Sequence, residues 1–288
     1  MRTRPPRLLC QPPSASDSEM FYRHVLDALN AHGVPYLVGG GYAINHYTGL
    51  NRSTKDMDLF IRRTDYGRVK DAFPEGEYEM HLTYPHWLGK LLFNAAYIDF
   101  IFSSGNGIAT VDEIWFQHAE HATILGVSTR LCPVEEMIWS KAFVMERERY
   151  DGADVAHLLQ ARGRSLRWAH LLERFDAHWR VLLSHLMLFG YVYPDQTDVI
   201  PADVMDALQK RLRQEAMAPV RTPSVCRGTL LSREQYLHDI QQWGMQDGRI
   251  IPFGNLTASE TEMWTLGIPK EKPCGDTHNV HGAKFADD

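Results

Sequence analysis

Two aspartates separated by one residue stand shortly after a run of three glycines near the start of the chain. Asp56 and Asp58 lie in an extended segment, in which residues two apart share a face and lie about 7 Å apart at Cα. A third aspartate, Asp99, interrupts an apolar segment of β-favouring residues. Because carboxylate oxygens are the ligands that Mg²⁺ prefers, these three side chains predict a metal site. Two Mg²⁺ ions there would hold the attacking and leaving oxygens of an in-line displacement, and Asp99 would activate the attacking hydroxyl.

The glycine run predicts a phosphate site beside the carboxylates. Gly39, Gly40 and Gly41 follow a short apolar strand, and the missing Cβ permits positive φ and close approach of a ligand to the backbone. A short helix is predicted over residues 42–48, and the N–H groups at its N-terminus would point at phosphate. The carboxylates and the glycine turn together predict a site for a nucleoside triphosphate (NTP). The sequence leaves open which two of the three glycines contact the phosphates.

The surrounding pattern predicts an α+β fold, in which a small mixed-sheet domain is followed by an all-helical domain. Helices and strands are mixed as far as Cys132, and one predicted hairpin pairs residues 90–93 with 96–102. Beyond Cys132 the pattern is helical, with predicted helices at residues 133–149, 151–160, 166–176, 178–189 and 202–216. The chain is therefore divided into a disordered tail, an α/β domain, a helical domain and an extension, at residues 1–16, 17–132, 133–220 and 221–288.

The extension has the weakest pattern of the chain. One helix is predicted over residues 232–243, and the polar, proline-dotted sequence after it predicts a largely irregular tail. We expect much of the last 25 residues to be mobile.

Composition and charge exclude several classes of protein. The net charge of −6 over 288 residues argues against a protein that coats nucleic acid non-specifically. The four cysteines lie far apart, which predicts free thiols in a reducing cytoplasm.

No apolar stretch approaches the roughly 20 residues of a membrane span. Three histidines of the helical region, His170, His178 and His185, have no cysteine or acidic ligand at close spacing in sequence, so the sequence predicts no zinc site.

These motifs resemble the nucleotidyltransferase superfamily, which shares the catalytic fold of DNA polymerase β. The signature of that family is an apolar residue, a glycine pair, a spacer, an Asp-x-Asp pair and a third carboxylate on a later strand. Here the glycine pair is Gly40-Gly41 and the spacer is the segment 42–55. The Asp-x-Asp pair is Asp56-Met57-Asp58, and the third carboxylate is Asp99. The resemblance implies a Mg²⁺-dependent enzyme that transfers a nucleoside monophosphate (NMP) from an NTP to a hydroxyl or amine and releases pyrophosphate.

A second element resembles the AbiEii-type branch of this family, many of whose members are bacterial toxin or phage-defence nucleotidyltransferases. The branch carries a Lys…Arg…Asp-x-x-Asp element, which is matched here by Lys141, Arg147, Arg149, Asp151 and Asp154. The resemblance implies that Lys141 contacts the triphosphate and that Asp154 positions it. It also suggests a toxin–antitoxin partner protein.

Each of these interpretations has an alternative. Arg52 and Lys55 precede the aspartates and are candidates to bind phosphate, but loop cations are usually only solvated. Lys141 is equally compatible with an exposed helix position beside an acidic neighbour. The acceptor is open between an RNA end, a protein and a small molecule. An arginine-rich helical region favours RNA, and the acidic net charge favours a small acceptor. A non-catalytic binding module with the same fold, such as a toxin–antitoxin component, is the alternative function.

Overall fold

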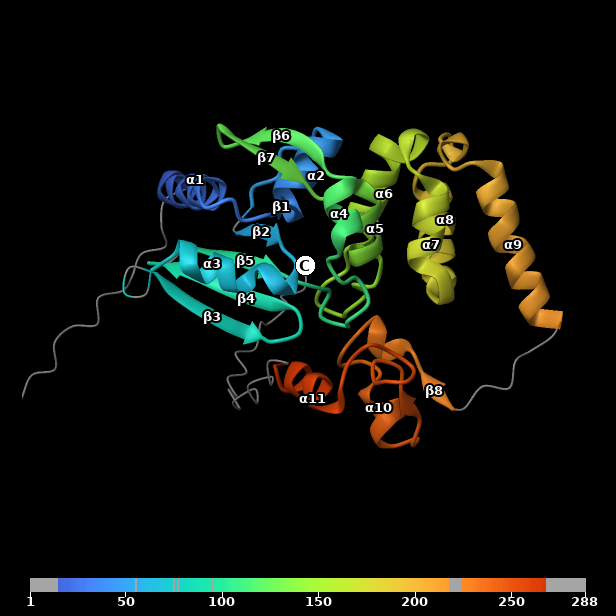
Figure 1. The fold of residues 1–288 in the computed structure, drawn as a ribbon. Coiled ribbons are helices and arrows are strands. Elements are labelled where there is room, and N and C mark those ends of the chain that lie inside the picture. Colours follow the sequence, from blue (N-terminus) through green and yellow to red (C-terminus); the bar gives the residue numbers. More distant parts are fainter. Residues whose placement is uncertain are drawn as a thin grey trace, which may run out of the picture.

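A computed structural model describes residues 15–54, 56–74, 76, 78–94, 96–217 and 224–267 of this protein. It confirms the predicted α+β architecture, in which a mixed sheet is followed in the chain by helices (Figure 1). Within the described residues no helix has the length and apolar character to cross a membrane.

The main sheet has seven strands in the order β3-β4-β5-β2-β1-β7-β6. Two neighbouring pairs, β2–β5 and β1–β7, are parallel, and the other neighbours are antiparallel. The predicted hairpin is formed by β4 and β5. The strand bounds are β1 Leu37–Val38, β2 Met57–Phe60, β3 Glu79–Tyr84, β4 Leu88–Phe93, β5 Ala96–Ile101, β6 Glu120–Ile124 and β7 Val127–Leu131.

Burial alternates along the central strands. In β5, Ile98 and Phe100 are fully buried, whereas Asp99 between them is only half-buried. In β2, Met57 and Leu59 are fully buried on either side of half-buried Asp58. Because successive side chains of a strand point to opposite faces, the apolar residues hold the sheet in the core and both aspartates emerge on the other face.

Four helices accompany the sheet strands in sequence. Helix α1 lies against β5 and β7, and its buried residues Val25, Leu26 and Leu29 repeat at helical spacing. Helix α2 starts in the glycine run and packs on β2. The bounds are α1 Ala15–Ala31, α2 Gly40–Thr48, α3 Tyr66–Ala72 and α4 Glu113–Gln117.

The helical part lies to one side of the sheet (Figure 1). Its helices are α5 Val134–Ala142, α6 Gly152–Arg162, α7 Trp168–Phe175, α8 Trp179–Val192 and α9 Ala202–Met217. The predicted helix over 133–149 was too long, because the chain leaves α5 after Ala142. It then turns back, with a β-bridge between Met145 and Tyr150, and the Asp151 amide donates to the Val144 carbonyl. The Met145 amide also donates to the distant Leu231 carbonyl at 3.1 Å, so this turn and a tertiary hydrogen bond replace the helix expected in this segment.

The extension is more ordered than the sequence predicts. The predicted helix over 232–243 is reduced to the short α10, and α11 forms in a segment that was expected to be irregular. Thr257 and Glu260 make a capping box at the start of α11, and Trp264 buries one side of it. The element bounds are β8 Val225–Cys226, α10 Leu237–Gln241, β9 Gln246–Asp247 and α11 Ala258–Leu266. The predicted disordered tail 1–16 was too long, because α1 already begins at Ala15, and the last 25 residues, expected to be mobile, begin within α11. The remainders of both tails, 1–14 and 268–288, lie outside the described residues.

A buried ion pair holds the extension together. Arg249 is 1% exposed and donates to both oxygens of Asp247 and to the Thr265 hydroxyl of α11. Asp247 also accepts from the Thr229 hydroxyl, so the network ties β9 to α11 and to the turn before α10.

Replacing this arginine should loosen the extension. We expect Arg249→Met to lower the free energy of unfolding by about 3–5 kcal/mol, because it leaves a buried carboxylate without its cation. Urea denaturation followed by tryptophan fluorescence measures the change. Arg164→Met, which removes an exposed ion pair with Asp198, is the control and should leave the midpoint unchanged. Equal midpoints for the two variants would contradict this account of the extension.

Candidate functional site

The three predicted carboxylates come together at the centre of the sheet. Strands β2 and β5 pair in parallel with Asp58 directly beside Asp99, and Asp56 lies just before β2. One carboxylate oxygen from each aspartate lies within 4.8 Å of the other two. Such a spacing lets several oxygens reach one divalent ion, or two neighbouring ions, after small side-chain rotations.

The positive charge around the aspartates is too small to keep the pKa values of Asp58 and Asp99 in their usual range. Burial, and then the negative charges of Asp56 and Asp99, raise the pKa of Asp58 to about 7. Burial also raises the pKa of Asp99, although a hydrogen bond from Lys90 opposes the shift. A divalent cation would oppose the raised pKa of Asp58 and of Asp99, so the residues present fit Mg²⁺ in both donor type and charge.

Two side chains that the sequence interpretation missed complete this cluster. Lys90 of β4 places its Nζ 2.5 Å from Asp99 Oδ1 and 4.3 Å from the centre of the Tyr97 ring. The Tyr97 hydroxyl donates to Asp56 Oδ2 at 3.4 Å. The signal for Lys90 was present in the predicted hairpin, because counting outward from its turn pairs Lys90 with Asp99.

The glycine turn lies directly against the aspartates. The Gly39 amide donates to the Asp58 carbonyl at 2.9 Å, and α2 begins at the next residue. Gly40 has φ of +52°, and a Cβ on it would lie 1.8 Å from Asp58 Oδ2. A Cβ on Gly41 would meet the Thr54 methyl group at 2.1 Å. A larger residue would therefore displace the Asp58 carboxylate at position 40 or the Thr54 side chain at position 41, so close contact as well as backbone conformation requires glycine here.

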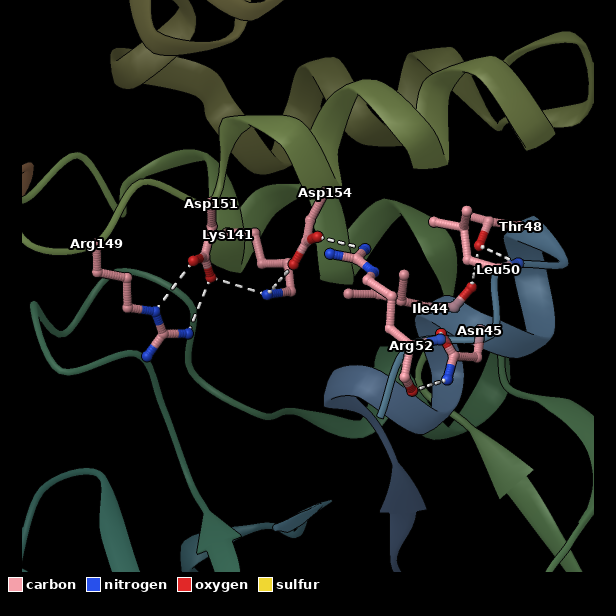
Figure 2. A network of polar contacts seen from close by, with 9 residues as sticks. All are labelled: Ile44, Asn45, Thr48, Leu50, Arg52, Lys141, Arg149, Asp151 and Asp154. Carbon is pink, nitrogen blue, oxygen red and sulfur yellow. Dashed lines mark hydrogen bonds and ion pairs between the residues drawn. The ribbon is translucent and has the colours of Figure 1, made fainter. Parts of the chain in front are cut away.

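A second polar network joins α2 to the helical part (Figure 2). Lys141 Nζ lies 2.8 Å from Asp151 Oδ2 and 2.8 Å from Asp154 Oδ2. Arg149 donates two hydrogen bonds to Asp151, and Arg52 donates to Asp154 at 2.6 Å. Because the chain turns back after α5, Asp151 lies in contact with both Lys141 and Arg149.

The loop that carries Arg52 is held by α2. The Asn45 side-chain amide donates to the Arg52 carbonyl at 2.8 Å, and its oxygen accepts from the Arg52 amide (Figure 2). Arg147 contributes less, because it is exposed and pairs with its neighbour Glu148. Lys55 lies outside the described residues.

The charges of this network extend to the carboxylates. Burial alone would raise the pKa of Asp154, but Lys141 and Arg52 outweigh it and hold that pKa below its usual range. Lys141 and Arg149 also act to lower the pKa of Asp58. Three cations against the two carboxylates of the network, Asp151 and Asp154, give it a net charge of +1. The arrangement can therefore attract an anionic ligand such as a triphosphate.

Comparisons with known proteins find similarity only among solved structures, since no family model and no curated protein matches the chain. The antibiotic-resistance factor ANT(2'')-Ia is 16% identical and covers 62% of this chain and 99% of its own, with a TM-score of 0.41. An antigenic nucleotidyltransferase-like protein from Paracoccidioides brasiliensis is 14% identical over 66% and 94%, with a TM-score of 0.41. The lincosamide antibiotic adenylyltransferase LnuA is 15% identical over 51% and 98%, with a TM-score of 0.35. At these identities and TM-scores the similarities do not establish the function of this chain, which is inferred below from the geometry of its site.

Gly40 and Gly33 offer a matched test of the contact with Asp58. Gly33 has φ of +59°, but a Cβ on it would meet no atom of the described residues within 4 Å. Both Gly→Ala variants should lose about 1–2 kcal/mol of stability from left-handed backbone strain. Only Gly40→Ala should also weaken binding of Mn²⁺, by about tenfold or more, because it displaces an oxygen ligand. Isothermal titration measures this, and unchanged Mn²⁺ affinity in Gly40→Ala would contradict the geometry.

The ion pair of Lys90 with Asp99 should oppose metal binding. Lys90→Met removes one positive charge beside the site, which is worth on the order of 1–2 kcal/mol and makes Mn²⁺ bind about tenfold more tightly. Lys70→Met makes the same change at an exposed position of α3 and should have no effect. Weaker binding in Lys90→Met, or an equal change in Lys70→Met, would show that Lys90 does not compete with the cation.

Proposed function

We propose that this protein is a divalent-metal-dependent nucleotidyltransferase, which moves an NMP from an NTP to an acceptor hydroxyl or amine and releases pyrophosphate. The observation that carries the proposal is the meeting of three carboxylate oxygens within 4.8 Å, against a glycine turn that starts a helix. A structural role does not account for this cluster, because gathering half-buried carboxylates costs stability.

The aspartates are the proposed metal ligands. Asp56, Asp58 and Asp99 would each offer one oxygen to Mg²⁺, and the remaining positions suit phosphate oxygens and water. Bound Mg²⁺ would neutralise the triphosphate and orient its α-phosphorus for in-line attack. Two bound ions are proposed, and the stoichiometry of the Mn²⁺ titration tests this number.

The other residues of the site bind and orient the substrate. The first N–H groups of α2, at Gly40 and Gly41, are the proposed contact for the β and γ phosphates. Lys141 and Arg149 add the positive charge that favours the triphosphate on the helical side. The carboxylates of Asp151 and Asp154 position Lys141.

Asp99 is the proposed general base. Its pKa is raised, chiefly by burial, which favours proton acceptance from an attacking hydroxyl. Lys90 now donates to the same carboxylate at 2.5 Å, so this ion pair must open, or share the carboxylate, when the acceptor binds. The reaction then breaks the bond between the α-phosphorus and the bridging oxygen, while the acceptor oxygen or nitrogen forms the new bond and its proton passes to Asp99.

A small molecule is the acceptor that the surface charges favour. The arginines that suggested an RNA track are each engaged by a carboxylate, in the pairs Arg162–Glu120, Arg164–Asp198, Arg167–Glu135, Arg174–Asp112 and Arg180–Glu215. Cations already paired offer less to a phosphate backbone than free ones. We therefore propose a small hydroxyl- or amine-bearing acceptor ahead of an RNA end. The alternative function is a non-catalytic binding module with the same fold, such as a toxin–antitoxin component, which the charged cluster does not favour.

Removing one aspartate should separate activity from folding. We expect Asp58→Asn to lower transfer of labelled NMP by about 1,000-fold, because a metal ligand is lost. The same change should keep or raise the melting temperature, because it removes a repulsive buried charge. Pyrophosphate release and uptake of α-labelled NTP into metabolite, RNA and protein fractions measure activity and acceptor class.

Asp71→Asn, at an exposed position of α3, is the control and should retain full transfer. Wild-type-like activity in Asp58→Asn would defeat the proposal. Label in the RNA fraction alone would overturn the choice of a small acceptor while leaving the transfer reaction in place.

A further inference from the structure

A second set of metal-binding side chains lies between the sheet and the helical part. His118 directly follows α4, Glu136 lies on α5 and His170 lies on α7. One ligand atom from each lies within 4.8 Å of the other two. In sequence His170 had no neighbouring ligand, which argued against zinc, but the fold brings both partners to it from distant segments.

The contacts within this cluster leave two polar atoms without hydrogen bonds. His170 Nε2 lies 2.6 Å from Glu136 Oε1, and the rings of His118 and His170 meet edge to face with centres 4.8 Å apart. Glu136 is 0% exposed, yet its Oε2 has no hydrogen-bond partner within the described part of the chain, and the same holds for buried His118 Nδ1. A fully buried carboxylate oxygen without a donor is costly, and Glu136 Oε2 is such an oxygen.

The neighbouring arginine does not remove this deficit. Arg174 Nε donates to Glu136 Oε1 at 3.2 Å, but its two terminal nitrogens donate to Asp112 at 2.7 and 2.9 Å. Arg167 is likewise paired, with Glu135. The charges of both arginines are therefore matched by other carboxylates, and Glu136 Oε2 is left as a ligand atom for a further cation.

We propose that His118, Glu136 and His170 bind a zinc ion. Two imidazole nitrogens and one carboxylate oxygen form a ligand set typical of Zn²⁺ and unsuited to Mg²⁺, which prefers oxygen alone. Ligand atoms that share a zinc ion at about 2.0–2.1 Å lie about 3.3 Å apart, so the 2.6 Å contact would open by less than about 1 Å.

The position of the cluster indicates a structural ion rather than a catalytic one. Glu136 is fully buried and the His170 side chain is 13% exposed, which admits a water molecule as fourth ligand but not a substrate. The ion would join the end of α4, in the sheet part, to α5 and α7 of the helical part (Figure 1). Helix α5 carries both Glu136 and Lys141. The zinc ion would therefore hold the helix that positions Lys141, without contacting the proposed nucleotide site.

Zinc binding by the full-length chain tests this site. An Asp58→Asn background weakens metal binding at the aspartates, and chelator-stripped protein is titrated with zinc against a chromophoric competitor. We expect one tight zinc ion per chain, a rise in melting temperature on adding zinc, and neither effect with Mg²⁺. His118→Asn, His170→Asn and Glu136→Gln should each weaken zinc binding by roughly 100-fold and abolish the thermal shift.

The control is His121→Asn, which removes an exposed histidine of β6 and should leave zinc binding unchanged. Absence of tight zinc binding in the background protein, or zinc affinity unchanged from the background in the His118→Asn and His170→Asn variants, would overturn the proposal. If a variant does not fold, the absorption spectrum of the Co²⁺-loaded background protein decides. Bands of a four-coordinate site with nitrogen ligands support the proposal, and the spectrum of six-coordinate Co²⁺ with oxygen ligands overturns it.

Discussion

Mutual repulsion among three carboxylates is the constraint on which the rest of this structure depends. Asp56, Asp58 and Asp99 are brought within reach of a common ion, and burial together with their like charges raises the pKa of Asp58 to about 7. Local contacts do not favour such a cluster, so rigid elements have to impose it. The parallel register of β2 and β5 fixes two of the aspartates side by side, and fully buried apolar neighbours in the same strands anchor that register in the core.

Positive charge reaches this cluster from two directions with different consequences. Lys90 contacts Asp99 from the neighbouring strand and competes with any metal for that oxygen. Lys141 and Arg149 act from the helical side, where Asp151 and Asp154 hold Lys141 between them (Figure 2). In the proposed reaction the first cation has to yield for a metal or acceptor to reach Asp99, whereas the second group would add positive charge for the triphosphate. In the protein without ligand, lysine side chains thus pair with carboxylates of the site and its surroundings, and a bound metal and triphosphate would replace some of these ion pairs.

The sequence was most informative where the chemistry is local. The Asp-x-Asp pair, the glycine turn and the β4–β5 hairpin were predicted because each is set by short spacing and strand periodicity. The helix expected to continue to Arg149 stops at Ala142, since bonds to distant segments outweigh propensity there. Helix α11 was missed because a capping box and one buried tryptophan, rather than an apolar stripe, define it. The cluster around His170 and the carboxylate partners of the arginines depend on contacts between distant elements, which no spacing in the sequence reveals.

The central claim is that the three aspartates hold a divalent metal with an NTP. A crystal of the full-length protein grown with Mn²⁺ and a non-hydrolysable NTP tests it most directly, because Mn²⁺ is located by its anomalous scattering. The account predicts an anomalous peak within about 2.0–2.6 Å of oxygens from Asp56, Asp58 and Asp99, with the phosphates at the start of α2. A bound NTP whose phosphates lie away from these aspartates, or Mn²⁺ held elsewhere with the aspartates free, would contradict it.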